Sequence, residues 1–119
     1  MFVPPLKITF LGTGTSSGVP MIACDCDICM STNEKDKRLR SSILVQSDTT
    51  TIVIDTTPDF RTQMLRENVK QLDAVLFTHP HKDHVAGLDD VKSFNLKENP
   101  RLKKVKKVNL DLNNKIDLQ

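Results

Sequence analysis

The histidines of this chain gather in one short segment. His79, His81 and His84 are the only three in 119 residues, and they lie with Asp83 in "THPHKDHVAGLDD" (78–90). In extended backbone, residues two apart project to the same side, so His79 and His81 present their imidazoles side by side. Asp83 and His84 add a carboxylate and a third imidazole. Histidine with carboxylate suits divalent Zn, Mn, Fe or Ni, and Zn is the usual choice.

Four potential ligands in six residues exceed what one tetrahedral ion needs from a single segment. Two ions about 3.5–4 Å apart use such a set better, and a metal pair of this kind generates hydroxide near neutral pH and clamps both oxygens of a phosphoester displacement. The spacing therefore predicts a dinuclear hydrolytic site. The alternative is a histidine-rich surface loop, or histidines that cap the following helix.

A buried strand is expected to lead into these histidines, at residues 72–78. Pro80 then prevents a helix through them. A helix is expected over 84–95, because Val85, Leu88 and Val91 recur on one side. In α/β folds the sites lie beyond the carboxyl ends of the strands. The N-terminus of this helix would face the metals and favour an anionic substrate.

The segments before residue 72 predict further alternation of strands and helices. The expected elements are a strand at 6–12, a loop at 12–20, a hairpin of strands at 41–46 and 50–55, and an amphipathic helix from Thr57 to about Asn68. Thr57 is a suitable N-cap and Pro58 suits the first helical position. Phe60, Met64 and Leu65 share one face of this helix. The layout indicates a single α/β domain.

A second cluster of potential ligands is the CxCxxC segment of Cys24, Cys26 and Cys29. Three thiols close together in a reducing compartment favour a structural zinc site. Reduced, metal-free cysteines are the alternative. Every histidine is already used, so Asp25, Asp27, water or another chain would have to complete the tetrahedron.

The last part of the chain, residues 96–119, has a different composition. Four lysines predict either a solvated face or a phosphate-binding tail; they are Lys103, Lys104, Lys106 and Lys107. Weak alternation of apolar residues suggests a hairpin around Asn113 and Asn114. We therefore divide the chain into a domain at 1–95 and a basic tail of unclear structure at 96–119.

The overall composition limits the partners that we expect. The net charge is only +2, which does not by itself indicate nucleic acid or membrane. No segment approaches the ~20 apolar residues of a membrane helix. The start of the chain lacks the pattern of a signal peptide, and three cysteines argue against a closed disulfide framework. A cytoplasmic location is the expectation.

The segment His79–His84, "HPHKDH", resembles the HxHxDH signature of the metallo-β-lactamase superfamily, and the preceding "AVLFT" and following Gly87-Leu88 fit it as well. The resemblance implies that His79 and His81 bind a first metal. Asp83 and His84 would bind a second, and Asp83 would also act in catalysis by orienting the nucleophilic water. Asp55, at the end of "TIVID", matches an acidic residue that supports the ligands from behind; a turn residue at a strand end is the alternative.

Two further segments resemble particular branches of this superfamily. "LGTGTSSGVP" (11–20) is similar to the first loop of its phosphodiesterase and tRNA 3′-processing branches. "GVPMIACDCDIC" (18–29) is similar to the cyclic phosphodiesterase of phosphonate breakdown, which implies structural zinc at the cysteines. The implied fold is the N-terminal half of an αββα sandwich, a mixed sheet with helices on one face. The later half of that fold supplies further metal ligands, so the resemblance implies a fragment, a truncated gene product, or a chain that is completed by a homodimer partner or a complementing chain.

Three functions remain open. The first is a metal-dependent hydrolase that uses activated hydroxide on a small phosphodiester or a nucleic-acid-like substrate. The second is a non-catalytic metal-binding fragment of such an enzyme. The third is a weak nucleic-acid-binding module that uses the lysines of 103–107, and its binding would fall steeply with salt.

Overall fold

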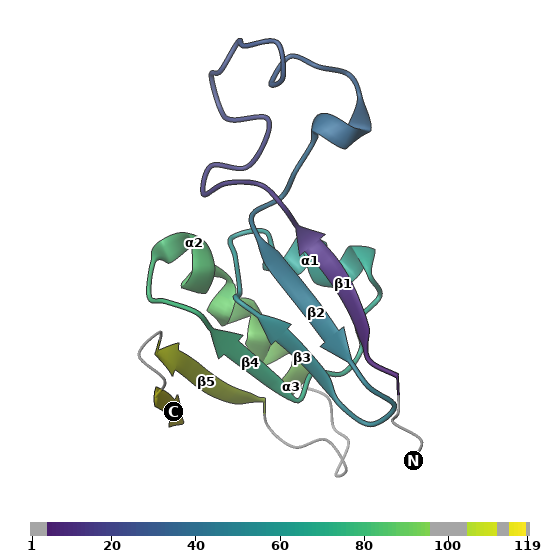
Figure 1. The fold of residues 1–119 in the computed structure, drawn as a ribbon, viewed down its shortest axis with the longest axis vertical. Coiled ribbons are helices and arrows are strands. Elements are labelled where there is room, and N and C mark those ends of the chain that lie inside the picture. Colours follow the sequence, from purple (N-terminus) through teal and green to yellow (C-terminus); the bar gives the residue numbers. More distant parts are fainter. Residues whose placement is uncertain (1–4, 96–104, 112–114, 119) are drawn as a thin grey trace.

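A computed structural model describes residues 5–95, 105–111 and 115–118. A six-stranded sheet with strand order β1-β2-β3-β4-β5-β6 forms its centre (Figure 1). The strands are β1 (Lys7–Gly12), β2 (Ser42–Gln46), β3 (Thr51–Ile54), β4 (Ala74–Phe77), β5 (Lys106–Asp111) and β6 (Lys115–Leu118). The helices are α1 (Phe60–Arg66), α2 (Lys82–Val85) and α3 (Lys92–Asn95), with 3₁₀ helices η1 (Glu34–Asp36) and η2 (Ala86–Val91).

The sheet is mixed, and its parallel part sets the position of the histidines. β1, β2 and β3 pair antiparallel, β3, β4 and β5 pair parallel, and β6 pairs antiparallel with β5. Ile54 of β3 is in register with Leu76 of β4. Because parallel neighbours end at the same edge of a sheet, the residues that follow β3 and β4 lie close together there.

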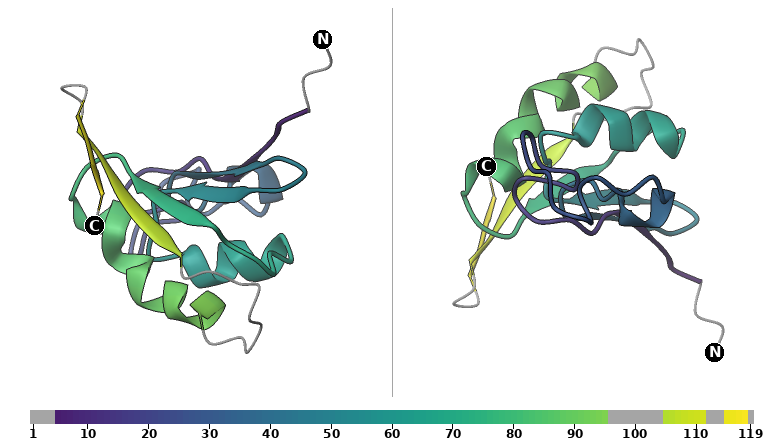
Figure 2. Two further views of the ribbon diagram at one scale, coloured as in Figure 1. Left: turned by 90° about the horizontal axis from the view of Figure 1, so that it is seen from below. Right: turned by 90° about the horizontal axis from the view of Figure 1, so that it is seen from above.

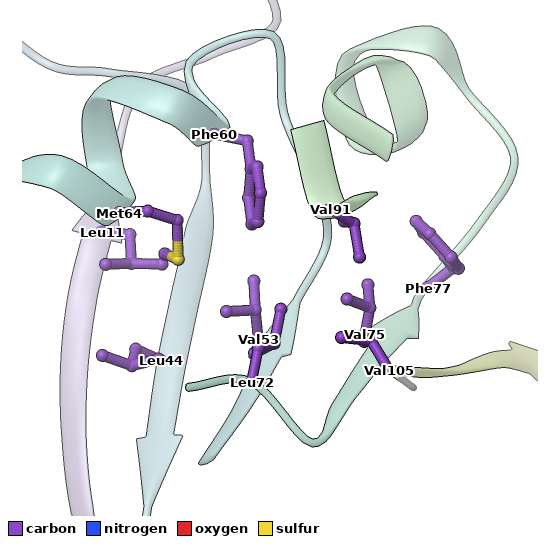
Figure 3. Close-up of a cluster of buried hydrophobic side chains, with 10 residues drawn as sticks. All are labelled: Leu11, Leu44, Val53, Phe60, Met64, Leu72, Val75, Phe77, Val91 and Val105. Atoms are coloured by element: carbon purple, nitrogen blue, oxygen red, sulfur yellow. The ribbon is translucent and has the colours of Figure 1, made fainter. Parts of the chain in front are cut away.

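α1 and the helices of residues 82–95 cover one face of the sheet, as both views of Figure 2 show. Between them lies the apolar core, drawn in Figure 3; its members are Leu11, Leu44, Val53, Phe60, Met64, Leu72, Val75, Phe77, Val91 and Val105. Val53 and Val75 are fully buried on the central strands and face Phe60 and Val91 of the helices. The expected α/β class, with a mixed sheet and helices on one face, is confirmed.

The opposite face of the sheet carries two rows of apolar side chains. One row runs across the strand register from Phe10 through Ile43 and Ile54 to Leu76, and the other is formed by Ile8, Val45, Ile52 and Ala74. Phe10 is 69% exposed and Ile8 is 58% exposed, whereas the residues on β2, β3 and β4 are half-buried. These rows are the apolar side chains of the sheet that the α-helices leave uncovered.

The predicted start of α1 was wrong by a few residues. The helix begins at Phe60 with Asp59 as its N-cap, and it ends at Arg66. Thr57 lies before the helix, fully buried, where its hydroxyl accepts the N–H of Asp59 at 3.1 Å. Leu65, which we expected on the buried face with Phe60 and Met64, is 61% exposed.

The single helix expected over 84–95 is three short pieces, α2, η2 and α3, and it begins at Lys82 inside the histidine segment. The change occurs around Gly87, whose N–H donates to the Thr56 carbonyl at 3.0 Å. A Cβ on Gly87 would lie 2.2 Å from the Thr57 carbonyl oxygen, so this contact needs glycine. α2 has only four residues, so the expected helix N-terminus at residue 84 is not found, and the preference for an anionic substrate stays a prediction.

The end of the chain continues the same sheet. β5 pairs with β4, and β6 returns antiparallel with Asp111 opposite Lys115, so the hairpin predicted in this region is confirmed. Its turn at 112–114 lies outside the described residues, as do Lys103 and Lys104. Lys106 is exposed and Lys107 is half-buried. The division of the chain at residue 95 stays a prediction.

Among the helices of the described residues, none combines the length and the apolar character that a membrane-spanning segment requires.

Candidate metal centre

The histidine segment follows the carboxyl end of β4 and runs into α2 (Figure 1). The ring centroids of His79 and His81 lie 4.6 Å apart with the rings edge to face. The rings of His79 and His84 lie 3.9 Å apart, tilted by 50°. The structure thus brings together the three imidazoles that the sequence predicted as ligands.

Asp55 lies beside these rings and contacts His84 directly and Thr78, the residue before His79. It directly follows β3, is only 4% exposed, and has a positive φ of 67°, a backbone conformation that non-glycine residues keep mainly where the surroundings enforce it. One carboxylate oxygen accepts the backbone N–H of Thr78 at 2.8 Å. The other accepts the Thr78 hydroxyl at 2.7 Å and lies 2.6 Å from Nδ1 of His84. Asp55 therefore organises the site from within the protein.

Asp83 and His84 contact each other directly. The Asp83 carboxylate lies 3.0 Å from Nε2 of His84. Ligand atoms that each bind a tetrahedral zinc at about 2.0–2.2 Å lie ~3.3–3.6 Å apart, so this contact would widen slightly to admit an ion. Because Nδ1 of His84 is held by Asp55, Nε2 is the atom that remains for a metal. The donor set of these two residues fits a divalent cation.

The four expected ligands do not converge on one point. Within the described part of the chain, the cysteines are the one group of three or more possible ligand residues whose ligand atoms all lie within 4.8 Å of one another. In the histidine segment, the ring of His79 lies nearer to that of His84 than to that of His81, so the pairing of His79 with His81 on one ion stays a prediction. Asp83 and His84 are partly buried, whereas His81 is exposed.

The cysteines lie on a long loop between β1 and β2 that projects away from the sheet, at the top of Figure 1. Sγ atoms of Cys24, Cys26 and Cys29 all lie within 4.8 Å of one another. Two sulfurs bound to one tetrahedral zinc at about 2.3 Å lie about 3.8 Å apart, so the trio fits such an ion. Neither Asp25 nor Asp27 joins this group.

Local hydrogen bonds favour one thiolate in this loop. The backbone N–H of Cys29 donates to Cys26 Sγ at 3.5 Å and, with the Cys24 and Cys29 thiols, lowers the pKa of Cys26 to about 7. The N–H of Met21 acts in the same direction on Cys29, but the Cys24 thiol, burial and the Cys26 thiol together raise the pKa of Cys29. The thiolate is the form that binds zinc, so Cys26 is the first ligand that we expect to form.

The base of this loop is fixed to the domain by an ion pair. Nη1 of Arg40 lies 3.0 Å from the carboxylate of Asp59, which also accepts the backbone N–H of Arg40 at 2.9 Å. Nε of Arg40 donates to the carbonyl of Ser16 at 3.0 Å. Gly14 and Val19 pair through their backbones with Leu39 and Arg38. The loop therefore projects from a defined stem.

An open hollow of about 380 Å³ lies beside Asp55 on the uncovered face of the sheet. Its lining comes from β1, β2 and the residues around them; these are Phe10, Gly12, Thr13, Ser41, Ser42, Ile43, Ile54 and Asp55. Small polar side chains and apolar side chains meet there. The candidate centre and the uncovered face are therefore continuous.

Comparison with known proteins agrees with the resemblance in the histidine segment. Residues 36–94 match the model of the metallo-beta-lactamase superfamily. A solved diphosphatase from the PhnP family is 48% identical, with a TM-score of 0.74 over 82% of this chain and 41% of that chain. Zn²⁺-bound PqqB from Methylobacterium extorquens is 26% identical, with a TM-score of 0.61 over 89% of this chain and 50% of its own.

An octanoyltransferase of Porphyromonas gingivalis is 48% identical over 89 residues, which are 74% of this chain and 18% of that protein. Because the match is so small a part of that protein, its name does not indicate an activity for this chain. The chain spans half or less of each of these three relatives. It contains a metallo-beta-lactamase superfamily domain over residues 36–94, and this confirms the family indicated by "HPHKDH".

Sequence reasoning identified Asp55 and the histidine segment but missed Thr78. Thr78 contacts Asp55 twice and lies 2.9 Å from Nδ1 of His79. The signal that could have found it is its position, since it follows β4 as Asp55 follows the parallel strand β3. The roles of the individual residues as ligands stay predictions.

We expect Asp59→Ala to loosen the stem of the cysteine loop, because Arg40 loses the carboxylate that holds its side chain and its N–H. Amide hydrogen exchange at Gly14, Val19 and Arg38 should become faster, by about tenfold or more if ~1.5 kcal/mol of local stability is lost. Glu34→Gln is the matched control, since it removes an exposed pair with Lys37 in the same loop. Equal exchange rates in the two variants would contradict the assigned role of Asp59.

Proposed function

We propose that this chain forms the part of a metal-dependent hydrolase that carries the first metal ligands, and that the substrate is a phosphodiester. The observation that carries the proposal is the Asp55 network, which orients imidazoles beyond two parallel strand ends. The superfamily match and the diphosphatase neighbour support hydrolysis. Support for a phosphodiester comes from the resemblance at residues 11–29.

His79 and His81 would hold one divalent cation, and Asp83 and His84 a second one. Zn is the first choice, and Mn, Fe or Ni would also suit these ligands. When bound, such ions act as Lewis acids and lower the pKa of water to about 7. Asp83, half-buried and next to Nε2 of His84, would orient the nucleophilic water through its second carboxylate oxygen. Asp55 would keep the imidazoles in place during turnover.

A structural zinc ion at Cys24, Cys26 and Cys29 would serve a separate purpose. The long loop between β1 and β2 contributes no residue to the apolar core, so its own folding has little hydrophobic stabilisation. A metal that crosslinks three thiolates supplies folding free energy directly. The missing fourth ligand would be water or a residue from another polypeptide.

The remaining ligands of the histidine segment would come from outside these 119 residues, because all three histidines already lie in that segment. The uncovered face of the sheet adjoins Asp55 through the hollow described above. A second copy of this chain or a complementing chain that packs on the rows of Phe10 and Ile8 would reach the centre. Such packing would remove the apolar side chains of that face from water.

Hydrolysis of bis(p-nitrophenyl) phosphate with added Zn²⁺ or Mn²⁺ tests the proposal. His81→Ala and Asp83→Ala should each lower kcat/KM at least ~100-fold, since even residues that only support metal ligands cost 10–100-fold. Lys82→Ala is the matched control, an exposed side chain between them, and it should retain activity. Metal binding without turnover in the unaltered chain would instead support a non-catalytic metal-binding fragment.

Cobalt binding tests the cysteine site separately. Co²⁺ added to the metal-free chain should give the near-ultraviolet absorption of thiolate-to-metal charge transfer. Cys26→Ser should weaken it strongly, because one of three thiolate ligands is lost, and His81→Ala should leave it unchanged. The same spectrum in Cys26→Ser and the unaltered chain would exclude Cys26 as a ligand.

A further inference from the structure

We propose that Thr78 is a positioning residue that fixes the tautomer of His79 and so leaves Nε2 of His79 as the atom that binds a metal. This inference rests on the proposed function for its purpose, but its chemistry can be tested without any metal. It assigns a role to a residue that is not itself an expected ligand but contacts one, His79.

The Thr78 side chain is held in a single orientation. Its backbone N–H donates to one oxygen of the Asp55 carboxylate at 2.8 Å, and its hydroxyl lies 2.7 Å from the other oxygen. Both contacts come from one buried carboxylate across the ends of two parallel strands. The hydroxyl therefore cannot rotate away without breaking a bond to a buried carboxylate, which is costly.

The hydroxyl has one proton, and this decides the direction of its next hydrogen bond. An ionised carboxylate can only accept, so the Thr78 proton points at Asp55. The Thr78 oxygen also lies 2.9 Å from Nδ1 of His79. Toward that ring it can only accept, so Nδ1 of His79 must carry the ring proton. The lone pair of neutral His79 is then on Nε2.

The same argument gives the proton position of His84, but here Asp55 contacts the ring directly. Its Nδ1 lies 2.6 Å from the oxygen of Asp55 that also accepts the Thr78 hydroxyl. Nδ1 of His84 therefore donates to Asp55, and Nε2 faces the Asp83 carboxylate at 3.0 Å, on the side where a metal would bind. The Asp55 carboxylate thus determines which nitrogen is protonated in two rings. It acts on His84 directly and on His79 through Thr78. The described residues give His81 no such partner, so it serves as an internal comparison.

A histidine ligand whose second nitrogen has a fixed acceptor binds metal more tightly, because its tautomer and orientation are already set. Thr78→Val keeps the shape of the side chain but removes the acceptor for Nδ1 of His79. Thr78→Ser keeps the hydroxyl. The two substitutions therefore separate the hydroxyl from the packing of the side chain.

Long-range ¹H–¹⁵N NMR of the metal-free chain, at a pH where the imidazoles are neutral, reads each tautomer directly. We expect His79 to be protonated at Nδ1 in the unaltered chain and in Thr78→Ser. In Thr78→Val the share of this tautomer should fall, while His84 should stay protonated at Nδ1. Metal affinity of Thr78→Val should fall about 10–100-fold and should recover in Thr78→Ser.

Protonation of His79 at Nε2 in the unaltered chain would overturn the inference. This measurement does not depend on whether a variant folds. An unchanged His79 tautomer in a folded Thr78→Val chain would overturn it as well. Neither result would bear on phosphodiester hydrolysis. Conversely, an unaltered chain that fails to turn over substrate but shows these tautomers would overturn the proposed function alone.

Discussion

The buried carboxylate of Asp55 is the constraint on which the candidate centre depends. It is 4% exposed and adopts a positive φ of 67° directly after β3. Burying a carboxylate is costly unless its oxygens are hydrogen-bonded. The parallel pairing of β3 and β4 supplies those bonds, because it brings Thr78 and His84 to the same edge. The parallel pairing of β3 and β4 thus both builds the sheet and orients the imidazoles.

One face of the sheet is covered by helices and the other is not. The uncovered face adjoins the metal centre and therefore bears on what completes it. One face packs against α1, η2 and α3 around Val53 and Val75. The other presents two apolar rows to solvent, with Phe10 the most exposed of them on β1. Because the hollow beside Asp55 opens on this second face, a layer that covered the rows would also close the site.

Much of the fold could be predicted from local sequence. The strands, the hairpin, α1 and the histidine segment all have short-range signals in alternation, caps and spacing. The failures involve contacts distant in sequence. Gly87 packs against the Thr57 carbonyl and divides one expected helix into three, and the exposure of Leu65 depends on how α1 packs on the sheet. Thr78 was missed because its role needs the register of β4 with β3, which no periodicity in the sequence specifies.

Native mass spectrometry of the purified chain tests the central claim most directly, since it gives the metal count and the oligomeric state together. The account predicts two transition-metal ions beyond any cysteine-bound zinc, per chain or per dimer, and their loss in a chain with His81→Ala. A chain that carries no metal beyond one thiolate-bound zinc would contradict it. The histidine segment would then have the geometry that Asp55 imposes but would bind no metal.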